Sequence, residues 1–184
     1  MQVVAVFLGL GVLAIIAAIT YTAGYRPYGY AGLGDISVLI FFGFVAVMGS
    51  AYLYEQQLNW YYALPAISTG LFSVAVLNVN NIRDIESDKQ AGKYSIPVRL
   101  GRQRAVVYHW ALLSLGLTTT LVYIGLNFES PFQLLVLLII PLLLKNARAV
   151  KVYEEAAALD PFLKQMALST LFFVILFGVG QLLG

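Results

Sequence analysis

Residues 63–93 read ALPAISTGLFSVAVLNVNNIRDIESDKQAGK, and this stretch decides the fold because a long apolar run ends in a dense polar cluster. The apolar part, up to Leu77, is long enough to form most of a membrane-spanning helix. If the helix continues through the cluster, Asn80, Asp84 and Asp88 recur at i, i+4 and i+8. The two carboxylates would then share one face of the helix.

The Asp pair suits a hard cation that also holds a phosphate. Asp84 and Asp88, with the carboxamide of Asn80, offer the oxygen ligands that Mg²⁺ takes from proteins. An ordinary helix end with salt bridges, such as Asp84 to Lys89 or Asp88 to Lys93, would show the same spacing. The position at a membrane boundary favours the metal site, because polar groups there are costly and usually functional.

The composition indicates an integral membrane protein. Of the 184 residues, 60% are hydrophobic and 11% are charged, and the mean hydropathy is +0.83. These values lie outside the range of soluble domains. No linker or low-complexity segment interrupts the chain, so we expect one transmembrane domain over residues 1–184, an all-α polytopic helix bundle, with membrane lipid around it and no nucleic-acid partner. The absence of cysteine excludes disulfides and thiol catalysis.

Uncharged gaps between charged residues predict six membrane spans, since about 20 apolar residues cross a bilayer. The predicted spans are Gln2–Thr22, Ile36–Tyr54, Leu58–Asn81, Ala105–Leu126, Pro131–Leu144 and Phe162–Leu183. The fifth is short and contains Pro141, so it must extend toward Val150, kink, or lie deeper than its neighbours. His109, alone inside the fourth span, is expected to form a hydrogen bond between helices.

The basic residues predict the orientation. All 11 lie in the loops after the first, third and fifth predicted spans: Arg26; Arg83, Lys89, Lys93, Arg99, Arg102 and Arg104; Lys145, Arg148, Lys151 and Lys164. Basic loops stay in the cytoplasm. We therefore expect a multi-pass protein of the cell membrane (the inner or cytoplasmic membrane) with the Asp-rich and basic loops cytoplasmic and both termini outside.

Two motifs resemble one known family. The run VNNIRDIESD at 79–88, continued by AGK at 91–93 and VRLG at 98–101, resembles the second Asp-rich motif of the UbiA superfamily of intramembrane prenyltransferases. It is most similar to the version in 1,4-dihydroxy-2-naphthoate polyprenyltransferases of menaquinone synthesis. The run YRPYGYAGLGD at 25–35, followed by FFG at 41–43, resembles a cytoplasmic loop of the same subfamily.

The resemblance implies an enzyme and its partners. It implies Mg²⁺-dependent transfer of a polyprenyl group from polyprenyl diphosphate to the ring of 1,4-dihydroxy-2-naphthoate. The site residues that it implies are Asp84 and Asp88 as catalytic and metal-binding groups, Asn80 as a further metal ligand, Asn81, Lys93 and Arg99 at the diphosphate, and Tyr25, Arg26, Tyr28 and Tyr30 at the acceptor. Lys93 and Arg99 are equally consistent with the ordinary excess of basic residues in cytoplasmic loops. The tyrosines are also consistent with the aromatic belt that lies at a membrane interface.

The resemblance also implies a missing part. Such enzymes have nine transmembrane helices and two Asp-rich motifs, and this chain matches the last six helices and the second motif only. We therefore expect a truncated copy, a gene fragment, or one half of a split enzyme with a separate N-terminal half as partner, and no activity from this chain alone.

Two alternatives remain at this point. A UbiA relative that acts on 4-hydroxybenzoate, homogentisate or haem would keep the site and change only the acceptor. A non-enzymatic six-helix transporter half would use its carboxylates to bind a translocated ion. Transporter sites lie near the middle of the membrane, whereas the Asp pair here lies at the end of a predicted span.

Overall fold

The computed structural model describes residues 2–25 and 27–184, and all regular structure in this part of the chain is helical. Five stretches are long and apolar enough to cross a membrane: Val3–Thr22, Gly34–Glu55, Trp60–Arg83, Arg102–Leu126 and Ala156–Leu182. The predicted all-α membrane bundle is confirmed, and the helices agree with five of the six predicted spans within a few residues.

Each long stretch is built from one to three helices. The first two stretches comprise α1 (Gln2–Thr22), then α2 (Gly34–Val38), the π-helix η1 (Leu39–Met48) and α3 (Gly49–Glu55). The third comprises η2 (Trp60–Tyr62) and α4 (Ala63–Arg83), and is followed by the short helices α5 (Ile85–Gln90) and α6 (Ile96–Leu100). The chain ends with α7 (Arg102–Leu126), the 3-10 helix η3 (Pro131–Ile139), α8 (Ile140–Val152) and α9 (Ala156–Leu182).

The predicted fifth span is not confirmed. Residues 131–152 are helical, but they are not among the five stretches that are both long and apolar enough to cross a membrane, so the count of six is not confirmed. Three cations, Lys145, Arg148 and Lys151, lie in α8 and lower its hydropathy. The predicted extension past Leu144 is confirmed, because α8 runs to Val152. Nine residues of 3-10 helix and 13 of α-helix reach about 37 Å, which exceeds a bilayer core.

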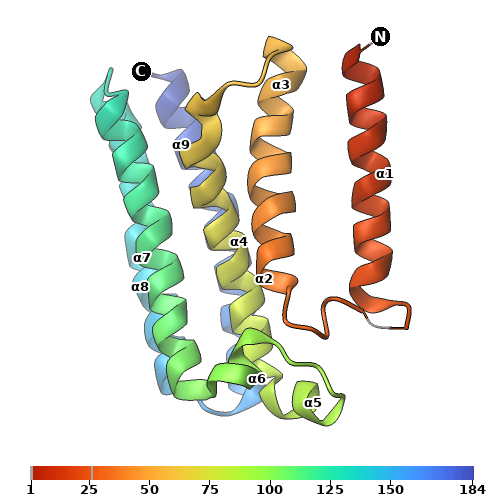
Figure 1. Cartoon of the computed structure of the whole chain (residues 1–184). Coiled ribbons are helices and arrows are strands. Elements are labelled where there is room, and N and C mark those ends of the chain that lie inside the picture. The colour runs from red at the N-terminus through yellow and green to blue at the C-terminus, as the bar shows by residue number, and fades with distance from the viewer. Residues whose placement is uncertain (1, 26) are drawn as a thin grey trace.

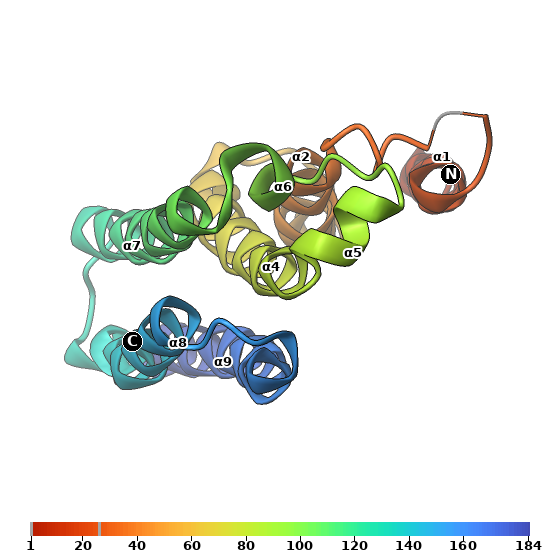
Figure 2. The same cartoon turned by 90° about the horizontal axis from the view of Figure 1, so that it is seen from below.

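The helices form two rows with α4 at the centre (Figures 1 and 2). Seen from below in Figure 2, α7, α4, α2 and α1 follow one another in one row, and α8 and α9 form the other. Helix α4 packs against α7, η1 and α9, and buries half of its apolar stretch. Helix α1 lies at the edge of the bundle, and no residue of its most apolar segment is buried.

Glycine permits the close crossing of η1 and α4. A Cβ atom on Gly43 would lie 2.6 Å from the carbonyl oxygen of Ala66 and 3.1 Å from the Cα of Gly70. Small residues at such a crossing let two backbones approach, which is how helices pack in lipid. The crossing fixes η1 against α4.

Buried polar side chains join α7, α8 and α9. The ring Nε2 of His109 and the Oδ1 of Asn146 are 3.0 Å apart, which confirms the predicted hydrogen bond between helices. The Asn146 amide also donates to the carbonyl of Phe162 and to the side chain of Gln165. Hydrogen bonds of this kind hold helices together where hydrophobic burial gives little preference.

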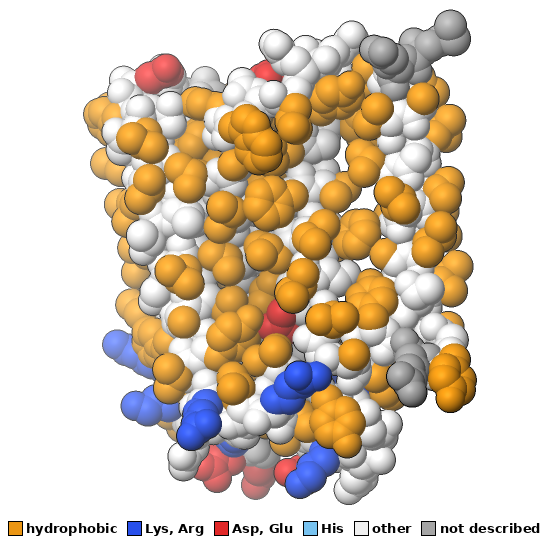
Figure 3. Space-filling view, in the orientation of Figure 1, with side chains coloured by type: hydrophobic (Ala, Val, Ile, Leu, Met, Phe, Trp, Pro, Cys, Tyr) orange, Lys and Arg blue, Asp and Glu red, His pale blue; other side chains and the backbone are white. Residues whose placement is uncertain are grey.

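Charged groups gather at one end of the bundle. Figure 3 shows Lys and Arg side chains at the lower end, where Figure 1 places α5 and α6. Both chain ends lie at the opposite end (Figure 1). This arrangement positions the polar cluster at the charged end of α4.

Candidate functional site

The helix containing the polar cluster breaks at Asp84. Helix α4 ends at Arg83 and α5 begins at Ile85, and the backbone of Asp84 has φ −97° and ψ 12°. The condition considered for the sequence, that the helix continues through the cluster, is therefore not met at this residue. The amide of Asp88 still donates to the carbonyl of Asp84 at 2.8 Å, so the chain keeps a helical turn between the two carboxylates.

Asp84 faces a guanidinium. Its two carboxylate oxygens accept from Nε and Nη2 of Arg83 at 2.7 and 2.9 Å. Asn80 lies beside this pair, since its amide donates to Asp84 at 3.3 Å and its carbonyl accepts from Arg83 at 3.0 Å. The other arm of Arg83 reaches Asp160 in α9 at 2.8 Å. The end of α4 is thus tied to α9.

Asp88 faces an ammonium group instead. The Nζ of Lys93 lies 2.8 Å from its carboxylate, and the hydroxyl of Ser95 donates to the same oxygen at 3.2 Å. Lys93 also donates to the amide oxygen of Asn81 at 3.2 Å. Asp88 is buried, with 9% of its surface exposed. The salt bridge that the sequence offered as the alternative reading, Asp88 to Lys93, is present.

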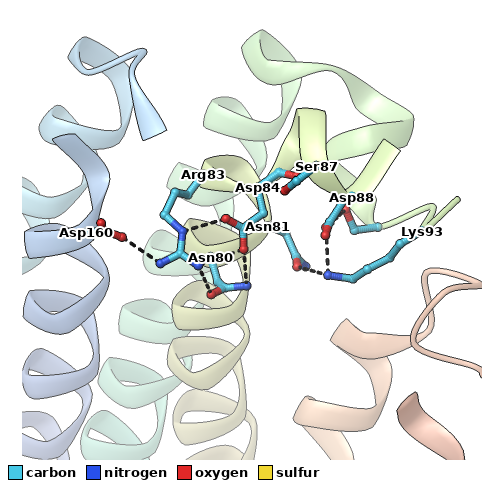
Figure 4. A network of polar contacts seen from close by, with 9 residues as sticks. Asn80, Asn81, Arg83, Asp84, Ser87, Asp88, Lys93 and Asp160 are labelled. Atoms are coloured by element: carbon cyan, nitrogen blue, oxygen red, sulfur yellow. Dashed lines mark hydrogen bonds and ion pairs between the residues drawn. The ribbon is translucent and has the colours of Figure 1, made fainter. Parts of the chain in front are cut away.

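The two carboxylates therefore have different partners, as Figure 4 shows. Within the described part of the chain, no three acidic, His or Cys side chains form a group that would hold a metal by themselves. The donor chemistry nevertheless fits Mg²⁺, because Asp84, Asp88, Asn80 and Asn81 supply hard oxygens. The ion pairs form two separate groups. Arg83 with Asp84 and Asp160 carries one net negative charge, whereas Lys93 with Asp88 is neutral. The excess negative charge of the first group favours a cation.

A hollow of about 630 Å³ begins beside this network. Asn80 and Lys93 line it together with apolar side chains from η1, α4 and α9, including Phe42, Leu77 and Leu163. Tyr21, from the end of α1, also lines it. The hollow is therefore polar at one end and apolar along its walls.

The tyrosine-rich loop after α1 lies at the edge of this region. Tyr25 is 94% exposed and Tyr30 is 39% exposed, and Arg26 lies outside the described residues. Tyr28 points inward, where its hydroxyl donates to the carbonyl of Ala17 at 2.9 Å. It lines a second hollow of about 450 Å³. The two hollows share four residues: Tyr21, Val38, Phe42 and Leu77.

Arg99 has a different setting from the one expected. Its Nε donates to the carbonyl of Tyr94 at 2.9 Å and its Nη2 to the carbonyl of Ala31 at 2.7 Å. The amide of Tyr94 in turn donates to the carbonyl of Tyr30 at 2.9 Å. Arg99 thus holds the loop after α1 against the loop after α5, and it does not line the hollow beside Asn80.

Sequence reasoning missed three residues of the site: Tyr21, Ser95 and Asp160. Tyr21 lines both hollows, Ser95 contacts Asp88, and Asp160 contacts Arg83. No motif marks Tyr21 or Asp160, because both reach the site through tertiary packing, whereas Ser95 lies seven residues after Asp88 in the same segment. The one available signal was that Asp160 is an acid within the basic end of the protein.

Together the fold and the site define a multi-pass helical membrane protein with an ionic cluster at one end of an apolar hollow. The UbiA prenyltransferase family model matches residues 1–180. The chain belongs to this family.

Curated relatives agree with this assignment. The chain is 48% identical over 97% of its length to the 1,4-dihydroxy-2-naphthoate octaprenyltransferase of Haemophilus influenzae, and covers 58% of that protein. It is 36% identical over 89% of its length to the protein of the same name from Mycobacterium tuberculosis, of which it covers 55%. It is 32% identical over 78% of its length to the 2-carboxy-1,4-naphthoquinone phytyltransferase of Synechocystis, of which it covers 47%. No solved structure matches the chain significantly.

The chain thus spans about half the length of the relatives it matches. The matches give no support to a separate N-terminal half as a partner.

Proposed function

We propose that this chain carries the second carboxylate site of a prenyltransferase that moves a polyprenyl group from polyprenyl diphosphate to the ring of 1,4-dihydroxy-2-naphthoate, a step of menaquinone synthesis. Support comes from the family and from relatives up to 48% identical that are named for this acceptor. The observation that carries the proposal is the hollow of about 630 Å³, which joins an ionic end to apolar walls.

An amphipathic donor fits this hollow. A polyprenyl diphosphate has a charged head and a long apolar tail, and needs a site that accommodates both. Lys93 and Asn80 line the end at which the diphosphate would lie, while Leu77, Leu163 and Phe42 would contact the tail. Apolar walls also exclude water from the reacting carbon.

The ionic cluster is suited to holding the diphosphate. Lys93 is already directed by Asp88 and Asn81, so its ammonium is positioned before the donor arrives. In our proposal Asp84, Asp88 and Asn80 would bind Mg²⁺, and Asn81 would contact the diphosphate. Magnesium bound there would offset the charge of the diphosphate as the allylic carbon–oxygen bond breaks.

The reaction balances without a further co-reactant. The allylic carbon–oxygen bond breaks and diphosphate leaves with the electron pair. The prenyl carbon then bonds to the ring carbon that carries the carboxylate, which leaves as carbon dioxide. In this scheme the protein's part is to hold both substrates, to keep water out and to offset negative charge on the leaving group.

The acceptor is proposed to enter from the loop after α1. Tyr28 lines the second hollow, which shares four residues with the donor hollow, so an acceptor there would lie next to the donor. Tyr25, Arg26 and Tyr30 stay predicted contacts of the acceptor, and Arg99 stays a predicted contact of the diphosphate. Arg99 supports the loop through its two backbone carbonyl contacts, which favours a positioning role.

We also propose the orientation. The multi-pass helices and the family place the protein in a membrane. The gathering of basic side chains at the end where α5 lies, which contains Asp88, favours a cytoplasmic location for that end, in the cell membrane. The transporter alternative loses support, because the matching family is one of prenyltransferases. No observation favours 4-hydroxybenzoate, homogentisate or haem over the naphthoate.

The test is an assay of prenyl transfer in membranes. This chain is fused behind the N-terminal segment of a curated relative and supplied with octaprenyl diphosphate, with magnesium or with a chelator. Transfer to 1,4-dihydroxy-2-naphthoate that exceeds transfer to 4-hydroxybenzoate and stops with the chelator supports the proposal. Preference for 4-hydroxybenzoate, or equal transfer without divalent cations, contradicts it.

A further inference from the structure

A separate hollow of about 540 Å³ lies along α8. It is lined by Pro141, Leu144, Lys145 and Arg148 from α8, with Tyr153 and Phe162 beyond its end. None of these residues lines the hollow proposed for the donor. The lining residues of α8 recur every three or four positions, so they form one face of this helix.

The face combines two cations with an apolar floor. Lys145 and Arg148 are exposed, and in the described part of the chain neither forms a salt bridge. The acids nearest in sequence, Glu154 and Glu155, are exposed and do not line the hollow. The positive charge along this face is therefore not offset locally.

Arg102 offsets the negative charge at the end of α8. The last carbonyls of a helix carry partial negative charge, which would weaken the binding of an anion. Here Arg102 donates to two of these carbonyls, those of Val150, at 3.0 Å, and of Tyr153, so the end of α8 stays positive. Tyr153 itself stacks on Phe162, with ring centres 5.3 Å apart and an angle of 22° between the rings. The hollow thus has a flat aromatic wall beside a positive rim.

We propose that this hollow binds an anionic phospholipid, with the phosphate on Lys145 and Arg148 and an acyl chain along Leu144 and Pro141. The arginine fork suits two phosphate oxygens, and the lysine adds a point charge. Basic hollows at the ends of membrane helices attract anionic headgroups. The assignment is independent of the proposed prenyl transfer, because it uses none of that site's residues.

Lipid competition in the 184-residue chain tests this proposal. Trp60 and Trp110 are replaced by Phe, and Tyr153→Trp places a single reporter in the hollow wall. The purified chain is reconstituted in phosphatidylcholine, and quenching by brominated phosphatidylglycerol is compared with quenching by brominated phosphatidylcholine. Since each surface cation adds about fivefold to the binding of an anionic lipid, we expect a preference of about fivefold or more for phosphatidylglycerol.

Matched variants assign the effect to the hollow. Lys145→Gln with Arg148→Gln should reduce the preference to about onefold, whereas the control, Arg104→Gln with Lys151→Gln, removes the same charge outside the hollow and should retain it. The swap Lys145→Arg with Arg148→Lys should also retain it, and shows that the face tolerates substitution.

Three outcomes would overturn the proposal. An equal loss in both charge-removing pairs would mean that general surface charge causes the preference. Weak quenching by both lipids would mean that protein, such as a second copy of the chain, covers the hollow. Loss of the preference in millimolar inorganic phosphate, but not in sodium chloride of equal ionic strength, would mean that the site binds free phosphate.

Discussion

Asp84 and Asp88 lie one helical turn apart but in different electrostatic settings. Asp88 is buried between Lys93 and Ser95, whereas the side chain of Asp84 is 27% exposed and pairs with Arg83. If Asp88 is replaced by a neutral residue, the Lys93 ammonium keeps only the amide oxygen of Asn81 among these partners. Removing one partner of a mostly buried pair is more costly than removing one partner of a more exposed pair such as Asp84 with Arg83.

We predict that Asp84→Asn and Asp88→Asn each reduce prenyl transfer by about 100-fold, because each removes a carboxylate charge that, in our proposal, holds the metal at the diphosphate. The measurement is transfer in membranes by the fused enzyme described above, with Mn²⁺ binding to the variants followed by electron paramagnetic resonance. Glu86→Gln is the control, since Glu86 is an exposed acid of the same segment. Normal turnover and Mn²⁺ binding in either Asp variant would rule out the metal assignment.

Between elements, two loops dock through backbone contacts. Gly32 has φ +76°, and a Cβ atom there would lie 2.5 Å from the carbonyl of Tyr94. Arg99 donates to a carbonyl of each loop at this contact, that of Tyr94 and that of Ala31. The loop after α1 and the loop after α5 are therefore fitted to each other, and their docking holds the tyrosine-rich segment against Tyr94, the residue that follows Lys93.

This docking predicts that Gly32→Ala loosens the loop more than Gly92→Ala does. Both glycines have positive φ, and alanine at such a position costs about 1 kcal/mol. Of the two, only Gly32 would bring the added atom against a backbone oxygen, since nothing lies within 4 Å of a Cβ atom placed at Gly92. Hydrogen exchange should rise in residues 27–33 for Gly32→Ala alone. Equal exchange in the two variants would show that the docking is not maintained.

The network around Asn146 yields a prediction about helix association. Asn146→Ala removes hydrogen bonds to α7 and α9 and should destabilise the chain by about 1–3 kcal/mol in denaturation by dodecyl sulfate in mixed micelles. Thr120→Val is the comparison, because the buried Thr120 hydroxyl donates to the carbonyl of Gly116 in its own helix and, among the described residues, to no other helix. A smaller effect for Asn146 than for Thr120 would contradict a role of the network in joining helices.

For the whole molecule, both chain ends lie at the end opposite the ionic cluster (Figure 1). The proposed orientation places that cluster in the cytoplasm. The chain contains no cysteine, so single probes can be introduced without background. Gln57, Gln90 and Gln103 are all exposed and lie in loops or at helix ends.

We predict that cysteine at Gln90 or Gln103 reacts with an impermeant maleimide only in inverted vesicles, and that cysteine at Gln57 reacts only in intact cells. The basis is the excess of Lys and Arg at the end that holds α5 and α6. Labelling after solubilisation controls for reactivity. Reaction of Gln57 and Gln90 probes from the same side would refute the topology.

Much of this protein follows from the sequence alone. Five helical stretches agree with apolar runs, because a bilayer requires about 20 apolar residues per span and the chain meets that need locally. The polar cluster, its place at a helix end and the family resemblance could also be predicted, because each depends on a short run of sequence. The segment from Pro131 was ambiguous because its helix continues into a charged stretch, where hydropathy no longer reports the boundary.

Only the tertiary structure determined how the charges pair. Asp84 and Asp88 have the spacing of a shared face, but the break at Asp84 and the return of the chain at Lys93 give them separate cations. Arg83 binds Asp160, which is 77 residues away in the chain, and Arg99 binds Ala31, which is 68 residues away. A charged side chain can pair with any of several opposite charges near it in the sequence, and these local pairs differ little in free energy. The packing of α9 and of the two loops therefore decides which pairs form.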